Sequence, residues 1–347
     1  MNALIQDLLA ALPPRQVITD DLRRLAYGTD ASFYRLIPQV IAVIENEEQA
    51  RTVLATAGQH QTPVTFRAAG TSLSGQAISN GLLALIGEGF ATFELADDAS
   101  QVRVGPGMVG GEVNRRLAPL GKKIGPDPAS IGAAKIGGIA ANNASGMCCG
   151  TAQNSYKTLA GLRVMLADGT LLDTEDPLSI AAFSKSHAVL LGELERLGRD
   201  TRANAALAKR IRHKFKIKNT TGYSLNALVD FEDPIDILAH LMIGSEGTLG
   251  FMTRITYQTV IEDPCKASAL VFFPTSAPPA KPSSASSRSR CRRSNCSTAR
   301  PSTPSKTSPA CRPSCANWAK RPPRCSSKSA RRRRKACRKR SPPCSPH

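Results

Sequence analysis

The stretch Ile136–Gly146, IGGIAANNASG, decides the fold. From Gly137 to Gly146 no residue is charged, and only Ile139 and the two asparagines have bulky side chains. The pair Gly137 and Gly138 lets a ligand approach the backbone closely. The neutral donors and acceptors, which suit a ring edge or a ribose, are Asn142, Asn143 and Ser145. Such a run suits backbone that is pressed against a ligand, although a helix buried on a sheet would also use small residues.

A stiff segment precedes this stretch, and we treat the two as one candidate site. It reads IGPDPAS over Ile124–Ser130. Its prolines, Pro126 and Pro128, fix the backbone φ angle.

A second candidate site is Thr65–Gly75, TFRAAGTSLSG, which follows a predicted strand. Its small residues let successive backbone N–H groups approach an anion, while its hydroxyls and its arginine add donors and charge. The small residues are Ala68, Ala69 and Gly70, the hydroxyl donors are Thr71, Ser72 and Ser74, and the charge is Arg67. This pattern predicts a phosphate cradle without the lysine of a P-loop. The alternative is a tight surface turn.

A third candidate is Gly244–Gly250, GSEGTLG, which enters a predicted strand. Its three glycines recur at every third residue, and Ser245, Glu246 and Thr248 lie between them. The pattern favours contact with a cofactor. The alternative is an ordinary glycine turn before a strand.

Gly105–Gly110, GPGMVG, matches the dinucleotide fingerprint G-x-G-x-x-G, but we reject it as the main cofactor site. The preceding strand, QVRV, is half polar, whereas a central parallel strand is apolar on both faces. Pro106 also removes an N–H from the turn. We expect a loop beside the site.

The remaining pattern predicts short strands mixed with helices and many glycine turns, which indicates an α+β fold. We expect strands over 39–44, 63–66, 82–86, 101–104, 159–166, 171–173, 248–259 and 267–273. We expect helices over 4–12, from Asn46 onward, over 111–120 and over 188–212. No internal repeat is visible.

The net charge of +19 comes entirely from the last part of the chain. From Ser276 to His347 there are 20 Lys or Arg residues and no Asp or Glu, whereas the residues before Ser276 carry 26 Lys or Arg against 27 Asp or Glu. The tail also lacks Gly, Leu, Ile, Val, Met, Phe and Tyr, so it cannot form a core and should be disordered. Every residue encoded with T at the middle codon position is among those missing, so we predict a shift of reading frame near Thr275. The alternatives are a nucleic-acid-binding tail centred on Arg331–Lys335 and, because of the tail's cysteines, a metal site; no iron–sulfur or zinc spacing supports the latter.

The part before Ser276 has only three of the ten cysteines, Cys148, Cys149 and Cys265, which fits a reducing compartment. No stretch reaches the roughly 18 apolar residues of a membrane span. The N-terminus lacks the basic start of a signal peptide. We therefore expect a cytoplasmic protein, either free or peripheral at the inner face of the cell membrane.

Six motifs in order resemble the FAD-binding domain of the vanillyl-alcohol oxidase and p-cresol methylhydroxylase superfamily. The resemblance covers residues 27–274 and is strongest to the bacterial NAD-independent D-lactate dehydrogenase and glycolate oxidase branch. Four of the six motifs are those described above, over 65–75, 124–130, 136–146 and 244–250. The other two are YGTDAS at Tyr27–Ser32 and NTTGY at Asn219–Tyr223. The resemblance implies a two-subdomain fold of the p-cresol methylhydroxylase type. We expect a helical lead-in over 1–35, an FAD-binding domain over 36–274 and, from its composition, a disordered basic tail over 275–347.

Carried over position by position, the resemblance assigns the cofactor contacts. The pyrophosphate would be held by Arg67, Ala68, Ala69, Gly70, Thr71, Ser72, Ser74 and Gly75. The flavin end would lie by Pro126, Asp127 and Ser130. The cofactor would be lined by Gly137, Gly138, Asn142, Ser145 and Gly146, and its adenosine half closed over by Glu246, Gly247 and Gly250. Covalently flavinylated members often have His where this chain has Thr71, so the resemblance implies non-covalent FAD.

The resemblance also implies FAD-dependent oxidation of a small 2-hydroxy acid, with D-lactate as the expected substrate and glycolate or D-2-hydroxyglutarate as alternatives. The family continues into a substrate domain that this chain does not show, and an iron–sulfur cluster is expected only in an intact member. We assign no catalytic residue and no metal site, and we expect weak or absent turnover. A quinone or cytochrome could accept the electrons, and no nucleic-acid partner is expected; the alternatives are a non-catalytic flavin-binding fragment and a basic nucleic-acid binder. The basic stretch His213–Lys218 predicts a solvated strand edge or a cation near the flavin, where it would stabilise the reduced anionic form.

Overall fold

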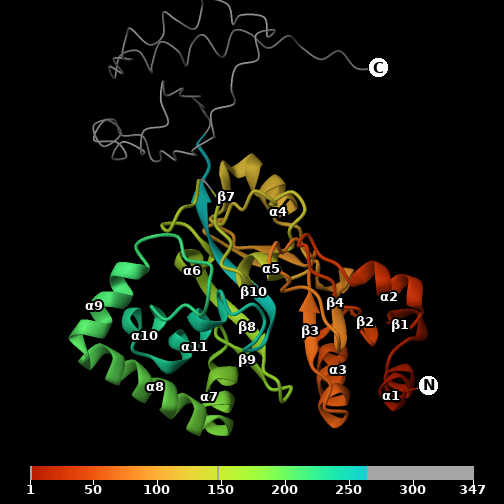
Figure 1. The fold of residues 1–347 in the computed structure, drawn as a ribbon. Helices are drawn as coiled ribbons and strands as arrows, with labels where there is room; N and C mark the ends of the chain where they lie inside the picture. Colours follow the sequence, from red (N-terminus) through yellow and green to blue (C-terminus); the bar gives the residue numbers. More distant parts are fainter. Residues whose placement is uncertain (1, 147, 264–347) are drawn as a thin grey trace, which may run out of the picture. The chain divides into compact units, whose positions relative to one another are not determined.

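Two β-sheets with helices packed on them organise the chain in the computed structural model, which describes residues 2–146 and 148–263 (Figure 1). The strand expected over 267–273, the basic disordered tail and the alternatives built on that tail lie outside the described residues. The shift of reading frame stays a prediction.

The first sheet has four strands in the order β1-β2-β4-β3. They are β1 (Val17–Ile18), β2 (Val40–Ile44), β3 (Val64–Arg67) and β4 (Leu82–Ile86). β2 and β3 both run parallel to β4, and β1 is antiparallel to β2. One face packs on α1 (Ala3–Ala11) and α3 (Glu47–Gln59), and Tyr27 of α2 (Asp21–Tyr27) packs on the other. This sheet is the support from which the loop after β3 projects.

Helix α3 begins where its sequence predicts. The Asn46 side chain accepts a hydrogen bond from the N–H of Gln49 at 2.9 Å. Glu47 and Glu48 lie in the first turn, where the helix dipole favours negative charge. Ala50, Val53 and Ala57 form the apolar face of the helix and are buried against the sheet.

The second sheet has six strands, in the order β5-β6-β10-β8-β9 with β7 on β10. They are β5 (Phe93–Leu95), β6 (Gln101–Val104), β7 (Lys122–Ile124), β8 (Leu159–Met165), β9 (Leu171–Asp173) and β10 (Phe251–Ile261). All the pairings are antiparallel. β6 alternates between half-buried and buried residues, as its half-polar sequence predicts. It is therefore not the central parallel strand that a dinucleotide fingerprint requires.

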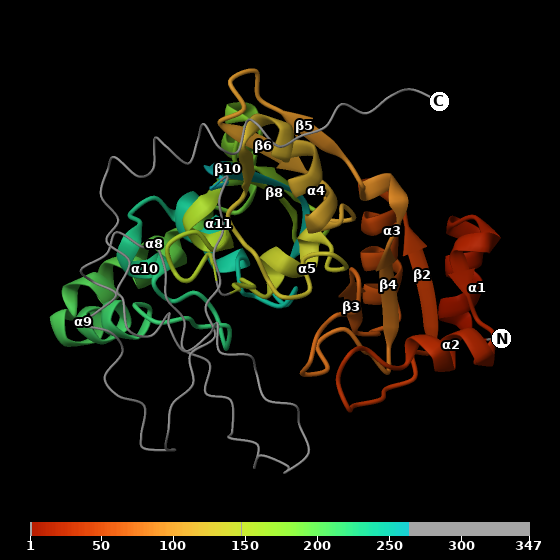
Figure 2. The same cartoon turned by 90° about the horizontal axis from the view of Figure 1, so that it is seen from above.

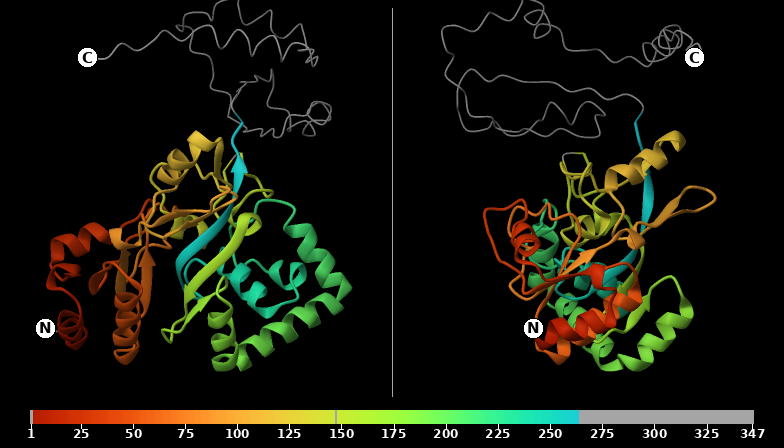
Figure 3. Two further views of the ribbon diagram at one scale, coloured as in Figure 1. Left: turned by 180° about the vertical axis from the view of Figure 1, so that it is seen from behind. Right: turned by 90° about the vertical axis from the view of Figure 1, so that its right-hand side faces the viewer.

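Helices fill the space around the second sheet. They are α4 (Gly110–Leu117), α5 (Ile136–Ala141), α6 (Ser155–Thr158), α7 (Pro177–Ser186), α8 (Ala188–Ala203), α9 (Ala205–Lys214), α10 (Ala227–Asp230) and α11 (Pro234–Met242), with the 3-10 turns η1 (Pro14–Gln16), η2 (Glu88–Phe90) and η3 (Ala118–Leu120). Helices α8 to α11 lie on the side of this sheet away from the first sheet (Figures 1 and 3). α5 lies between β3 of the first sheet and α11 (Figure 2).

Aromatic stacking joins the two sheets beside the loop after β3. Phe66 is the residue before Arg67, and its ring stacks on Phe251 of β10 with a centroid distance of 4.4 Å. Phe90 meets the same ring edge-on at 5.4 Å. Aromatic pairs in these geometries contribute beyond their buried area, so the start of the loop is fixed against both sheets.

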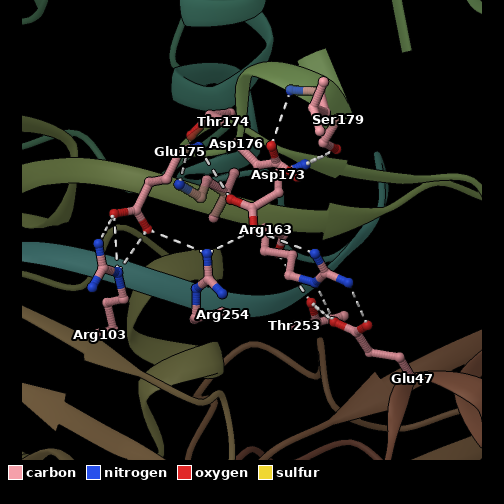
Figure 4. A network of polar contacts seen from close by, with 12 residues as sticks. Glu47, Arg103, Arg163, Asp173, Thr174, Glu175, Asp176, Ser179, Thr253 and Arg254 are labelled. Atoms are coloured by element: carbon pink, nitrogen blue, oxygen red, sulfur yellow. Dashed lines mark hydrogen bonds and ion pairs between the residues drawn. The ribbon is translucent and has the colours of Figure 1, made fainter. Parts of the chain in front are cut away.

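A network of three arginines and three carboxylates provides a second connection between the sheets (Figure 4). Glu47 of α3 accepts from Arg163 Nε at 2.7 Å and from Arg163 Nη2 at 2.9 Å. The network continues over the second sheet through Asp173, Arg254, Glu175 and Arg103. Burial raises the pKa of Glu47, but the hydrogen bonds from Arg163 and Thr253 bring it below its ordinary value. The charges balance, so little net charge is buried.

Most of the expected elements are present within a few residues of their predicted bounds, including the strands expected over 159–166 and 171–173, which pair as a hairpin. Three differences have clear causes. The expected helix over 188–212 is interrupted, because Asn204 ends α8 and caps α9 by accepting from Leu207 N at 3.0 Å. The basic stretch is not a strand edge, since His213 and Lys214 form the last turn of α9. Residues 136–141 form the short helix α5, so the alternative of a buried helix applies to that part of the glycine-rich stretch.

Candidate functional site

The loop after β3 presents backbone donors that the protein does not use. Within residues 2–146 and 148–263, no acceptor contacts the N–H groups of Ala68 to Ser72. These residues are half-buried, and Gly70 has a φ of 69°. Partly buried N–H groups need a partner, and a run of them forms a concave site for an anion. We call residues 67–75 the phosphate loop.

Helix α5 brings the glycine-rich stretch next to the phosphate loop. A Cβ atom placed on Gly138 would lie 3.7 Å from the Cβ of Ala68 and would meet nothing closer. Gly137 is packed more tightly, because a Cβ there would lie 2.7 Å from the Cβ of Pro106. The N–H of Gly137 donates to the Pro106 carbonyl at 3.0 Å, so the GPGMVG turn lies beside the site as expected.

Asp127 fixes the end of the glycine-rich stretch. Its Oδ1 accepts from the N–H groups of Gly146 at 3.1 Å and Cys149 at 2.9 Å, and its Oδ2 accepts from that of Cys148 at 3.0 Å. A Cβ atom on Gly146 would collide with the carbonyl of Asp127, which explains the glycine. Asp127 therefore holds the stiff segment and the glycine-rich stretch together.

The turn at 244–248 closes on the C-terminal end of α5. Gly244 N donates to the Ala140 carbonyl at 3.1 Å, and Glu246 N donates to that of Ala141 at 2.9 Å. The Asn142 side chain donates to Glu246 at 2.5 Å. Glu246 has a φ of 54°, a conformation that is unfavourable for a side-chain-bearing residue. Burial raises the pKa of Glu246, so its charged form carries a desolvation cost.

The predicted site residues are thus brought together, with a few exceptions. The phosphate loop, Asp127, the Gly137–Gly146 stretch and Glu246 form one chain of contacts around α5. Gly250 packs on β8, where a Cβ would lie 2.9 Å from the Met165 carbonyl, and Ser130 contributes its carbonyl to the N–H groups of Ala133 and Ala134. Their cofactor contacts stay predictions, as do those of the other assigned residues.

Two nearby groups are not among the cofactor contacts that the resemblance assigned. Lys218 Nζ donates to the carbonyl of Ser145, so this end of the basic stretch reaches the glycine-rich stretch. The hydroxyl of Ser245 is buried, with the residue 2% exposed, and it has no partner among the described residues. The alternating spacing of Lys214, Lys216 and Lys218 was a sequence signal for the Lys218 contact. No sequence signal marks an unpaired hydroxyl such as that of Ser245.

The four histidines of the described residues lie outside this cluster. His60 pairs with Asp7 at 2.7 Å, and His187 with Asp168 at 3.1 Å. His240 stacks on Phe231 at 3.9 Å, and burial lowers its pKa. His213 lies in the last turn of α9. Over the described ranges, no three His, Cys, Asp or Glu side chains gather as a metal site would require, and no helix could span a membrane.

Comparison with known proteins agrees with this geometry. The family described as FAD binding domain matches residues 38–175. D-2-hydroxyglutarate dehydrogenase of Escherichia coli is 27% identical over 239 residues, which are 67% of this chain and 23% of that protein. The glycolate oxidase subunit GlcD of Bacillus subtilis is 26% identical over 271 residues, 77% of this chain and 47% of that one. The chain thus spans between 23% and 47% of the length of these relatives.

Solved structures share the fold. An alkyldihydroxyacetonephosphate synthase matches with a TM-score of 0.51 at 16% identity, over 75% of this chain and 42% of that one. A BBE-like protein of Physcomitrella patens matches with a TM-score of 0.50 at 14% identity, over 75% and 45% of the two chains. The expected α+β fold is therefore confirmed, and so is FAD as the cofactor. The chain therefore carries an FAD-binding domain over residues 38–175, within an α+β fold that it shares with these solved structures.

Proposed function

We propose that this chain binds FAD non-covalently and serves in the oxidation of a small 2-hydroxy acid. The observation that carries the proposal is the run of free N–H groups at Ala68–Ser72, which lies beside the open face of Gly138. Backbone N–H groups bind a diphosphate without needing a charged side chain. The neutral stretch on the other side of this space suits the uncharged parts of a dinucleotide.

The residues fit the cofactor in their chemistry. The phosphate loop would hold the diphosphate, and Asp127 would keep the Gly137–Gly146 stretch in place without itself contacting FAD. Bound FAD supplies a two-electron acceptor for the substrate's hydride. At position 71 stands a threonine, whose hydroxyl is no usual site of flavin attachment, which supports non-covalent binding.

The relatives support the class of substrate. They include a D-2-hydroxyglutarate dehydrogenase and a glycolate oxidase subunit, and the substrates in both names are 2-hydroxy acids. Glycolate and D-2-hydroxyglutarate are therefore equal candidates for the substrate, whereas neither relative supports the expected D-lactate. A quinone or cytochrome acceptor stays a prediction, as does weak turnover by this chain.

A titration with FAD tests the proposal through a matched pair of variants. In Gly138→Leu the new side chain would project toward Ala68, where the protein leaves space. Gly192 lies exposed on α8, and a Cβ there would meet nothing within 4 Å. Both changes replace a helical glycine with a good helix former, so their effects on folding should be similar.

We expect wild type and Gly192→Leu to quench FAD fluorescence with the same dissociation constant, and Gly138→Leu to bind at least about tenfold more weakly. That ratio corresponds to about 1.4 kcal/mol of lost binding. Competition by ADP, but not by riboflavin, would locate the affinity on the diphosphate half. Absence of FAD binding by the folded wild-type chain, or equal affinities for the two variants, would contradict the proposal.

A further inference from the structure

A short strap runs from α2 to the first sheet over residues 27–36. Thr29 and Arg35 form an isolated antiparallel bridge, and Leu36 N donates to the Gly28 carbonyl at 3.0 Å. Phe33 is fully exposed and Tyr34 largely so, and no regular secondary structure covers them. Few buried apolar contacts hold the strap, so its position depends on polar ties.

Arg67 supplies the largest of these ties. Its Nη1 donates to the carbonyls of Tyr27 at 3.0 Å, Thr29 at 2.8 Å and Ala77 at 3.4 Å. The guanidinium also lies over the Tyr27 ring, 5.5 Å from its centroid. The Arg67 Nη1 atom thus connects the strap with Ala77, which follows the phosphate loop by two residues. The rest of the guanidinium lies against Gly70, where a Cβ atom would collide with it.

The strap in turn touches the phosphate loop at its turning points. Ala31 N donates to the Gly70 carbonyl at 3.1 Å, and Ala77 N donates to the Asp30 carboxylate at 3.4 Å. A Cβ atom on Gly75 would lie 3.0 Å from Cδ2 of Tyr34. Arg67 fixes the start of the loop, and these contacts orient the Gly70 carbonyl and the C-terminal end, so together they orient the N–H groups of Ala68–Ser72.

We propose that Arg67 is a positioning residue, which locks the strap 27–36 onto the phosphate loop and leaves the diphosphate to the backbone N–H groups of Ala68–Ser72. Only the identity of the ligand rests on the proposed function. The lock itself is a property of the chain without FAD. The alternative hypothesis is the one expected from the sequence, in which Arg67 contacts the pyrophosphate directly.

Chymotrypsin separates the two accounts in FAD-free, full-length protein. It cuts after Phe33 and Tyr34, whereas the basic segment from Ser276 onward has Trp318 as its sole aromatic residue. We expect Arg67→Met to be cut in the strap about tenfold faster than wild type, because opening of the strap no longer breaks charged hydrogen bonds. Arg202→Met is the control, since Arg202 Nη1 also donates to two carbonyls, those of Leu228 at 3.0 Å and Phe231 at 2.7 Å.

Arg202→Met should leave strap cleavage at the wild-type rate, and circular dichroism should show that both variants are folded. If Arg67 served only to contact the phosphates of FAD, its replacement would not change cleavage of the FAD-free protein. An unchanged cleavage rate in Arg67→Met therefore overturns the proposal. Arg67→Lys gives a second test. Lysine keeps the positive charge but lacks the planar guanidinium group whose Nη1 faces the three carbonyls. The lock predicts fast cleavage and weak FAD binding together in Arg67→Lys. If Arg67→Lys is cut fast but binds FAD with wild-type affinity, the result would instead favour direct contact between the charge at position 67 and the diphosphate. Absence of FAD binding by the wild-type chain would contradict only the proposed function.

Discussion

The ion pair between Glu47 and Arg163 should be a main connection between the two sheets, and Glu47→Gln tests it. The substitution keeps the size of the side chain and removes its charge. The carboxylate accepts two hydrogen bonds from Arg163 and one from Thr253 Oγ1 at 2.6 Å. Both side chains of the pair are 29% exposed, so solvent screens them only in part. Arg163 would keep its ion pair with Asp173, at 3.3 Å, and at most a neutral hydrogen bond to the glutamine.

Removing one partner from a buried pair costs about 3 to 5 kcal/mol, and an exposed pair contributes about 0 to 1 kcal/mol. The partial exposure of Glu47 places the expected loss between these limits, at about 2 to 3 kcal/mol. For a folded unit of this size, each kcal/mol lowers Tm by about 2 to 4 °C. We therefore expect Tm to fall by about 5 to 10 °C at pH 7.

Glu48→Gln is the matched control for this experiment. Glu48 lies in the same first turn of α3, so loss of its charge changes the helix-dipole interaction to a similar extent. It pairs with Arg51, and the two side chains are 76% and 41% exposed. We expect a fall of at most about 2 °C, corresponding to about 0.5 kcal/mol. Equal effects of the two substitutions in thermal melts would refute the role of the Glu47 pair.

The same pair predicts a dependence on pH. The pKa of Glu47 is lower in the folded chain than its ordinary value of 4.5, because the hydrogen bonds from Arg163 and Thr253 outweigh the effect of burial. A carboxyl with a lowered pKa stabilises the fold above its unfolded pKa and loses that contribution as the pH falls through its folded pKa. The difference in Tm between wild type and Glu47→Gln should therefore be constant near neutral pH and shrink below about pH 4.5.

Two further predictions concern the site itself. Burial raises the pKa of Glu246, so its ionisation opposes folding as the pH rises above 4.5; Glu246→Gln should therefore gain stability relative to wild type between pH 4 and pH 7, and a Tm difference that does not change with pH would contradict this. Burial, with the Asp127 carboxylate, raises the pKa of Cys149 to about 11, whereas Cys148 is exposed. Iodoacetamide at pH 8 should label Cys148 at least about tenfold faster by peptide mapping; equal rates in the folded protein would show that Cys149 is accessible.

The sequence predicted those features that depend on neighbouring residues. Asn46 caps α3, the Asp-Gly turn joins β8 and β9, and the apolar run of β2 forms a buried strand, because each signal acts within a few residues. The short elements β1, β5 and β7 were missed, since strands of two or three residues are formed by pairing rather than by their own propensity. The motifs predicted to contact the cofactor could be singled out because glycine and small residues are required wherever backbone approaches backbone or ligand, and their cofactor contacts stay predictions.

Contacts between distant residues could not be predicted in this way. Glu47 and Arg163 are 116 residues apart, and nothing in the first turn of α3 shows that one of its two glutamates is buried and the other exposed. Arg67 shows the same limit within the site. Its neighbours predict a phosphate loop, and an arginine in such a loop suggests a phosphate ligand, yet its Nη1 is directed to carbonyls 38 and 40 residues earlier in the chain.

Backbone N–H groups can bind a diphosphate only if the loop that carries them is held in one conformation before the ligand arrives. A loop of small residues has little side-chain packing of its own with which to do this. In this chain the rigidity comes from outside the loop, through Phe66 stacked on Phe251 at one end and Arg67 with the strap along its length. We therefore propose that Phe66 and Arg67, which border the small-residue loop of this chain, position the loop rather than contact its ligand.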